Sequence, residues 1–534
     1  MSGFAGMLRL AWRRNWLFCT CWVLGLSVLM PATVTKYHDL VSDGTDGQLM
    51  LAQLAANPTM RAILGPPFDL GTPGGFTFWR VGTFVAAAAA MMAALGVIRA
   101  TRAEEEEGRV ELVRSGAISR AVPLAAGIVL SLAACLATGV LIALFMLAAD
   151  TPAAGAWASG LGIALTGTMF TGVAAVLAQV FPSARTARVW SLGIALGGLY
   201  LLRAMVDGSG SSATLDAIRW AMPLDWASLV RPYASERWWV LLLPLAVTVV
   251  LVGLAFRLEA IRDHGAGLKA ASEGASEAAP YLSGAVGLSW RLQRVGVIGW
   301  TFGILVSAIG IGSLSTSLSQ MFEGQDQLME MLRKMGGGAE AIRDAYFIAM
   351  LGIMATIVTL AGVMVLSRLR AEESDGRSEV MLATATSRWR YGLSTLVPAV
   401  LLPVILLVAT GLLMPVAQAA KDGSASLVGT IAVASLVMLP GIVLVIGLAM
   451  LLVGLLPRWY GIVWAVLGWS ILVSWIMPLF DPPDWLLRLH PWGFLPHLPT
   501  DPMRWGAFSI ELALGLGMMA LGLVAYRRRD IAGR

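Results

Sequence analysis

A series of long apolar runs constrains this sequence most strongly. A bilayer offers no water to the backbone N–H and C=O groups, so an apolar run of about 20 residues predicts a membrane-spanning α-helix. Twelve runs meet this requirement. Their approximate limits are 16–35, 81–101, 121–148, 156–181, 189–206, 238–257, 293–313, 345–367, 391–415, 427–455, 460–479 and 507–526. We therefore expect an all-α polytopic membrane protein with 12 transmembrane helices.

The overall composition supports this expectation. Hydrophobic residues make up 57% of the 534 residues and charged residues only 13%, whereas a soluble domain carries about 25% charged residues. The formal net charge of +5 requires no nucleic acid as a partner, because cationic residues gather at membrane edges. The three cysteines lie in apolar runs, and no acidic cluster accompanies the four histidines. Neither a disulfide, a metal site nor a cofactor site is therefore expected in this chain.

A charged segment occurs twice, each time between two apolar runs. Arg102–Glu111 reads RAEEEEGRVE and Arg370–Glu379 reads RAEESDGRSE. A Ser-Arg pair follows each segment at the same spacing, as Ser119-Arg120 and Ser387-Arg388. Self-similarity at one fixed offset indicates an internal duplication. With six runs in each half, both halves enter the membrane from the same side, so the repeat is expected to be parallel.

The chain is expected to contain two transmembrane halves and a linker. Residues 1–262 form the first six-helix half and residues 284–534 the second. Residues 263–283 are rich in Ala, Gly, Ser and Glu, which predicts a flexible cytoplasmic linker between them.

The distribution of Lys and Arg sets the expected orientation. With both termini in the cytoplasm, roughly two-thirds of the basic residues face inward, as the positive-inside rule requires. The duplicated charged segments then lie on the cytoplasmic side. Residues 37–80 and 314–344 become long external loops, and Gln325–Leu332 in the second loop reads as an amphipathic surface helix.

Two interpretations of the duplicated segment compete. In the first it is an ordinary solvated loop, and Ser119 and Ser387 are simply helix N-caps. In the second it is a docking surface, because a surface that must fit a partner keeps its residues in order. The glycines then allow a bend before a second short helix. We favour docking for these matched residues: Glu104, Glu105, Gly108, Arg109 and Glu111, with Glu372, Glu373, Gly376, Arg377 and Glu379.

The pattern also resembles a known family. Acidic residues, a glycine, a glutamate three residues later and Ser-Arg before the next span are similar to the cytoplasmic loop between the second and third spans of ABC-2 type transport permeases. Residues Gly71–Thr77, which read GTPGGFT, support the likeness more weakly. The layout of two fused halves resembles actinobacterial permeases described as exporters of polyketide antibiotics and other drugs. The second copy departs from the pattern at Ser374 and Ser378, so the two docking sites are expected to be unequal.

The resemblance implies a fold and a mechanism. The fold is two parallel six-helix ABC-2 type (type V exporter-like) repeats in the plasma membrane of a bacterium. Two copies of a separately encoded ABC ATPase bind ATP and Mg²⁺, press on the coupling segments and drive multidrug efflux of hydrophobic or amphipathic compounds. The first, second and fifth spans of each half line the path. Candidate wall residues, for which plain helix packing is the alternative, are Trp22, Met91, Met92, Trp300, Phe347 and Met350.

Other classes of protein fit the sequence less well. None of the four lysines follows a glycine, so the chain has no phosphate-binding G-x-x-x-x-G-K-[ST] loop and is not expected to be an enzyme. The main alternative is an ion-gradient-driven secondary drug exporter with two six-helix halves. Such a protein usually carries ionisable groups inside the membrane. The apolar runs are almost free of acids, with Glu511 the clearest exception and Arg203 near an outer end.

Overall fold

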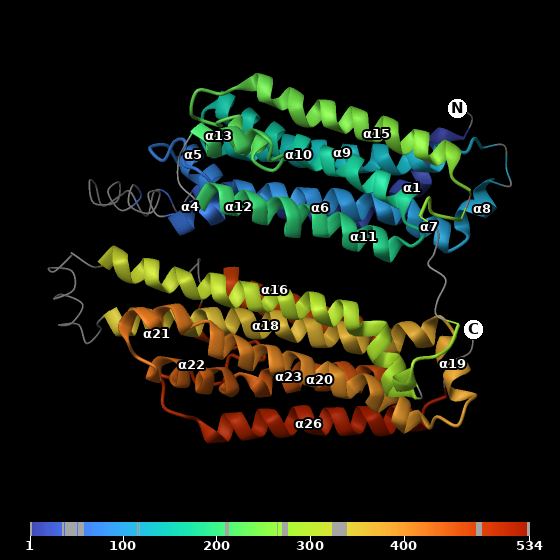
Figure 1. Cartoon of the computed structure of the whole chain (residues 1–534), viewed down its shortest axis with the longest axis vertical. Helices are drawn as coiled ribbons and strands as arrows, with labels where there is room; N and C mark the ends of the chain where they lie inside the picture. Colours follow the sequence, from blue (N-terminus) through green and yellow to red (C-terminus); the bar gives the residue numbers. More distant parts are fainter. Residues whose placement is uncertain are drawn as a thin grey trace. The chain divides into compact units, whose positions relative to one another are not determined.

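The chain forms two compact helical units. The computed structural model describes residues 3–34, 37, 51, 58–114, 116, 118–208, 213–263, 265–269, 276–282, 284–322, 339–476 and 483–530. Contacts divide the chain into Met1–Gly274 and Ala275–Arg534 (Figure 1). The described residues are helical or irregular and include no β-strand, so the predicted all-α class is confirmed. The amphipathic helix predicted at Gln325–Leu332 lies outside the described residues.

Ten helices among the described residues are long and apolar enough to cross a membrane. The predicted polytopic architecture is therefore supported, while the count of 12 is not confirmed. The ten candidate spans are Phe4–Val34, Pro73–Glu106, Val122–Ala148, Ala153–Val180, Trp238–Ile261, Ala285–Thr316, Arg343–Ser374, Arg388–Asp422, Ser426–Leu455 and Trp505–Arg528.

The predicted fifth span of each half, 189–206 and 460–479, is not among the ten. The described residues of both stretches, which in the second reach only to 476, are largely helical and include a π-helical segment. In the first unit the order is α11 (Ala184–Leu192), η2 (Gly193–Tyr200) and α12 (Leu201–Gly208), and in the second it is α24 (Gly461–Ile471) and η6 (Leu472–Ile476). The widened i→i+5 turn is rare and often occurs at functional sites.

The first unit is organised around one central helix. This helix, α10 (Ala153–Val180), packs on α6 (Thr83–Ala100), α9 (Val122–Ala148) and α15 (Leu242–Ile261). The first helix, α1 (Phe4–Leu29), packs on α9 and α6. Shorter elements lie at the two ends of this bundle (Figure 1). They are α4 (Pro58–Leu64), α5 (Pro73–Thr77), η1 (Phe78–Gly82), α7 (Arg102–Glu106), α8 (Arg109–Arg114), α13 (Ala213–Trp220), α14 (Trp226–Leu229) and η3 (Trp238–Leu241).

The second unit repeats the theme of long packed helices. Its long helices are α16 (Ala285–Phe322), α18 (Ala339–Ser374), α20 (Arg388–Leu413), α22 (Ser426–Val437), α23 (Leu439–Leu455) and α26 (Trp505–Arg528). Its shorter elements are η4 (Pro280–Leu282), α19 (Arg377–Leu382), α21 (Val416–Asp422), η5 (Pro457–Trp459) and α25 (Asp484–Leu487). The pair α23 and α26 packs most extensively. A Cβ added to Gly454 of α23 would lie 2.1 Å from the Gly522 carbonyl oxygen of α26, so glycine permits this close approach.

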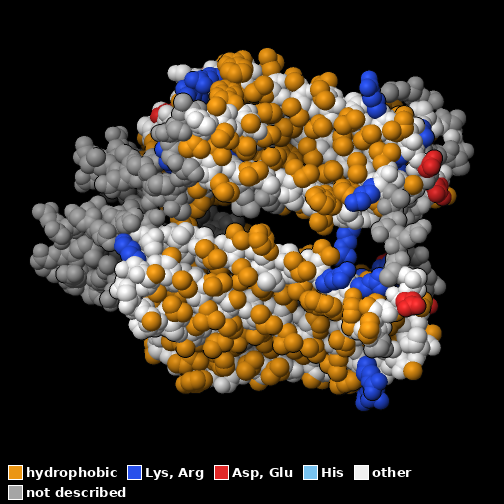
Figure 2. All heavy atoms as spheres, in the orientation of Figure 1, with side chains coloured by type: hydrophobic (Ala, Val, Ile, Leu, Met, Phe, Trp, Pro, Cys, Tyr) orange, Lys and Arg blue, Asp and Glu red, His pale blue; other side chains and the backbone are white. Residues whose placement is uncertain are grey.

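The outer surface of each unit is unusually apolar. Figure 2 shows hydrophobic side chains over the flanks of each unit and charged side chains near its ends. On α15, for example, Leu242, Val249 and Val250 are each more than 60% exposed. An apolar surface this extensive is expected to face lipid rather than water.

Candidate functional site

The first duplicated segment forms two short helices joined by a glycine bend. Helix α6 ends at Ala100, α7 spans Arg102–Glu106 and α8 spans Arg109–Arg114. Gly108 lies between the short helices with a φ of +69°, a value that strains residues with a Cβ. The bend predicted from the sequence is therefore present.

The second segment has the same bend. Helix α18 continues to Ser374, Gly376 has a φ of +74°, and α19 begins at Arg377. The copies differ in that no break separates α18 from its acidic residues, whereas Thr101 interrupts the helix in the first unit.

An ion pair spans each glycine bend in the same way. The Arg109 Nε donates to Glu104 Oε2 over 2.8 Å, and the Arg377 Nε donates to Glu372 Oε2 over 2.8 Å. The hydrogen bond to the facing carboxylate raises the pKa of both arginines. These arginines are partly exposed, so we expect the two ion pairs to contribute little to the stability of the fold. Their main effect is expected to be on the shape of the bend.

Each segment is also tied to the first long helix of its unit. In the first unit, Arg14 of α1 forms an ion pair with Glu104. In the second, Arg368 Nη1 donates to the Leu292 carbonyl oxygen of α16 over 2.8 Å, while its Nη2 donates to Glu372 over 3.2 Å.

The second acidic residue of each segment binds the residue that follows the last helix. Glu105 accepts hydrogen bonds from Arg262 at 2.7 and 2.8 Å and from the Gly265 backbone N–H at 2.8 Å. Arg262 directly follows α15. In the second unit Glu373 pairs with Arg529, which directly follows α26. These two glutamates are thus engaged inside their own units, which the sequence interpretation did not anticipate.

The Ser-Arg pairs reinforce the same attachment. Arg120 donates to the Arg262 carbonyl oxygen, and Arg388 donates to the Arg529 carbonyl oxygen over 2.6 Å. Ser387 is an N-cap as predicted, because its hydroxyl accepts from the Arg390 backbone N–H.

The N-cap prediction for Ser119 is wrong. Helix α9 begins at Val122 with Ala121 at the N-cap. Pro123 occupies its first turn, where the missing N–H of proline carries no penalty and the fixed φ suits a helix start.

The second short helix of each unit presents matching exposed side chains. Glu111 and Leu112 on α8 are exposed, with Leu112 at 77%, and Glu379 and Val380 on α19 are exposed, with Val380 at 71%. Each helix therefore displays a carboxylate beside an aliphatic group at the same position after the bend. A single exposed aliphatic side chain is common on protein surfaces, so the informative observation is that it occupies the same position in both copies.

Arg102 is a structural residue that the sequence did not single out. Its side chain is 1% exposed and donates to the carbonyl oxygens of Pro182, Gly265 and Ala266 at 2.6–3.2 Å. Nearby, the Lys269 N–H donates to the Val180 carbonyl oxygen over 2.9 Å. The part of the predicted flexible linker at 265–269 is thus fixed against the first unit.

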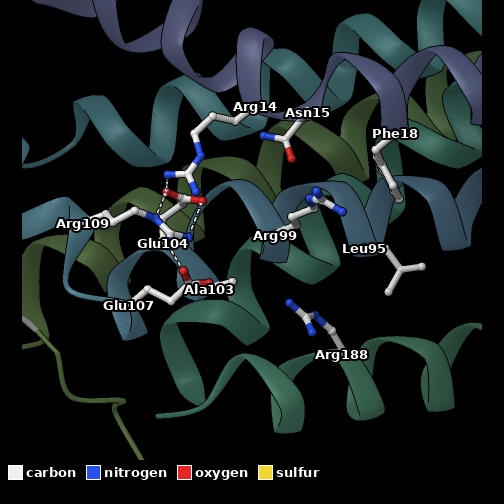
Figure 3. A pocket seen from close by; sticks show the side chains of 10 residues that line it. All are labelled: Arg14, Asn15, Phe18, Leu95, Arg99, Ala103, Glu104, Glu107, Arg109 and Arg188. Atoms are coloured by element: carbon white, nitrogen blue, oxygen red, sulfur yellow. Dashed lines mark hydrogen bonds and ion pairs between the residues drawn. The ribbon is translucent and has the colours of Figure 1, made fainter. Parts of the chain in front are cut away.

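A cavity of about 460 Å³ lies beside the first segment (Figure 3). It is bounded by α1, α6, α7, α8 and α11, and the Glu104–Arg109 pair forms one of its walls. Its lining residues are Arg14, Asn15, Phe18, Leu95, Arg99, Ala103, Glu104, Glu107, Arg109 and Arg188.

The candidate path residues of the first unit have different environments. Met92 is 1% exposed inside the helical core, and Met91 is half-buried. Trp22 packs against Phe18 of the same helix, with ring centroids 6.1 Å apart. Their predicted contact with substrate stays a prediction.

The candidate path residues of the second unit divide between two packed clusters. Phe347 is fully buried, and Met350 packs against the same cluster. Trp300 packs against the main core of the unit. Their predicted role is likewise untested.

Comparisons with known proteins point to one kind of protein. The family model described as "Multidrug efflux system permease Rv1217c, C-terminal domain" matches residues 282–527. The multidrug efflux system permease protein Rv1217c of Mycobacterium tuberculosis is 35% identical over 541 aligned residues, covering 99% of this chain and 95% of that protein.

Proposed function

The chain belongs to the family of the multidrug efflux system permease Rv1217c, and from this premise we propose that it is the membrane subunit of an ABC-2 type exporter. In this proposal it moves hydrophobic or amphipathic compounds, antibiotics and drugs among them, out of a bacterial cell. ATP and Mg²⁺ are bound by two copies of a separately encoded ATPase. This chain supplies the path and takes no part in hydrolysis.

The matched construction of the two charged segments supports the proposal. Each segment places a short helix with an exposed carboxylate and an exposed aliphatic side chain after a glycine bend. Each is tied to the first and the last long helix of its unit. A push on α8 or α19 is thereby transmitted to long helices rather than absorbed by a loose loop. A loop with no partner to move it needs neither feature.

The proposal also includes the membrane orientation expected from the distribution of Lys and Arg. Both termini and both charged segments lie in the cytoplasm, and the two halves are parallel six-helix repeats in the plasma membrane. The helical stretches that contain η2 and η6 then supply the fifth span of each half. Their π-turns mark them as positions where a helix can change its packing.

An ion gradient is the alternative source of energy, and one observation favours it. Glu511 in α26 is 8% exposed, and its Oε1 has no hydrogen-bond partner in the described part of the chain. An ionisable residue inside a membrane span is often functional.

One experiment tests the proposal against this alternative. The pair Glu111→Lys and Glu379→Lys reverses the exposed carboxylates, and we expect ATP-driven export in vesicles with the partner ATPase to fall at least tenfold. The pair Asp263→Lys and Glu277→Lys is the matched control, because both residues are exposed and lie outside the segments. Unchanged export by the first pair contradicts docking. Export driven by an imposed pH gradient without ATP, and lost in Glu511→Gln, establishes the alternative.

A further inference from the structure

The cavity beside the first charged segment contains more positive than negative groups. Four arginines and two glutamates line it. The glutamates are already engaged: Glu104 pairs with Arg14 and Arg109, and Glu107 pairs with Arg109. The cavity is therefore a candidate site for an anion.

The two remaining arginines project into this space from different helices. Arg99 comes from the last turn of α6 and Arg188 from α11 (Figure 3). Within the described part of the chain, neither has a carboxylate within ion-pair distance. Arg99 instead lies over the Phe18 ring, with its guanidinium carbon 5.6 Å from the ring centroid. A guanidinium presents a planar fork of donors that fits phosphate oxygens well.

The same cavity also has an apolar wall and apolar surroundings. Phe18 and Leu95 line it. Trp16 on α1 and Trp190 on α11 are 51% and 54% exposed, close in sequence to cavity residues. Tryptophan concentrates at the headgroup level of a bilayer. A ligand here therefore meets cations and apolar side chains in the same cavity.

We propose that this cavity binds the phosphate headgroup of an anionic phospholipid, with Arg99 and Arg188 as its principal cations. The acyl chains then follow the apolar surface beside Phe18 and Leu95. The bound lipid joins α1, α6 and α11 next to the coupling segment, so the occupancy of the site is expected to influence how that segment moves. This inference does not depend on the ATPase partner.

The second unit has no arginine at the position that corresponds to Arg99. Counting back three residues from the matched Arg102 and Arg370, Arg99 corresponds to Ser367. Ser367 donates its hydroxyl to the Met364 carbonyl oxygen of its own helix. The site is thus a property of the first unit, which makes a loss of binding in a first-unit variant simple to interpret.

The test is lipid binding by the purified full-length chain, measured by native mass spectrometry during titration with phosphatidylglycerol or phosphatidylcholine. A cation near a membrane surface contributes about 1 kcal/mol, or about fivefold in affinity, so Arg99→Ala with Arg188→Ala is expected to reduce the preference for phosphatidylglycerol roughly 25-fold. The matched control is Arg13→Ala with Arg185→Ala, which removes exposed arginines from α1 and α11 that do not line the cavity. This control should keep the wild-type preference.

Two further arms identify the source of the phosphate group. Arg99→Lys with Arg188→Lys keeps the charges and should retain most of the preference, which separates binding from misfolding. Inorganic phosphate and glycerophosphoglycerol carry the headgroup chemistry without acyl chains and should not displace the lipid at equal concentration. An unchanged preference in the alanine pair overturns the proposal. Complete displacement by free phosphate also overturns it.

Discussion

At the scale of single residues, a buried carboxylate outside the predicted spans is expected to control the pH dependence of stability. Asp225 is 2% exposed, and its carboxylate lies 3.7 Å from Arg203, which pairs more closely with Asp207 at 3.2 Å. Arg219 also binds Asp207, at 2.7 Å. Burial, together with the charge of Asp207, raises the pKa of Asp225 to about 8.

The direction of the pH effect follows from linkage. An unfolded aspartate titrates near about 4, so between that pH and about 8 the folded chain holds a proton that the unfolded chain has released. The stability of wild type therefore falls as pH rises through this window. We expect Asp225→Asn to reduce that slope and to melt at a higher temperature than wild type at pH 8.5. Thermal denaturation in detergent from pH 5 to 9 measures this. Asp216→Asn serves as the control, because this partner of Arg219 is 57% exposed. A wild-type slope in Asp225→Asn contradicts the assignment.

At the scale of elements, the glutamate that holds the end of α15 is expected to have the larger structural role of the two copies. Glu105 and Arg262 are 7% and 5% exposed, whereas Arg529, the partner of Glu373, is 20% exposed. Removing one member of a buried ion pair costs about 3 kcal/mol or more. We expect Glu105→Ala to lose about that much stability and Glu373→Ala clearly less.

Hydrogen exchange locates this effect. In Glu105→Ala the backbone amides at 262–268 should exchange faster, because the Gly265 N–H loses its acceptor and Arg262 loses one of its carboxylates. Glu106→Ala is a nearby comparison, since Glu106 instead accepts from the Ala184 N–H at the start of α11. If both variants loosen 262–268 equally, the attachment of α15 does not depend on Glu105.

The same elements show what the sequence could predict. The repeated glycines located both bends, because a glycine between helix-forming residues usually marks a bend or the end of a helix. The roles of Glu105 and Glu373 were not separable from those of their neighbours, since their partners lie more than 150 residues away. A signal did exist: Arg262 and Arg529 follow the last predicted span of each half at nearly the offset of the charged segments. Arg102 offered no comparable signal, because its carbonyl acceptors carry no sequence pattern.

At the scale of the whole molecule, the apolar runs alone were sufficient to predict a polytopic helical membrane protein. They did not determine the number of spans. The stretch at 184–208 contains Arg203 and Asp207, which are both fully buried in the folded unit. A hydropathy pattern cannot show that two charges compensate each other in space.

The two coupling segments are expected to work as one device. In the proposed ABC exporter the two ATPase subunits close on ATP together. The loss of one proposed docking site should therefore disable the whole closing motion. We therefore expect Glu111→Lys alone and Glu379→Lys alone each to reduce ATP-driven export nearly as far as the double variant, instead of by half. Export in vesicles and substrate-stimulated ATP hydrolysis measure this, with Asp263→Lys as the single-charge control. The contrary outcome is that each single variant keeps half of the wild-type export and the double variant none. The two segments would then act independently. The attachments to α1, α15, α16 and α26 would in that case act only within their own units.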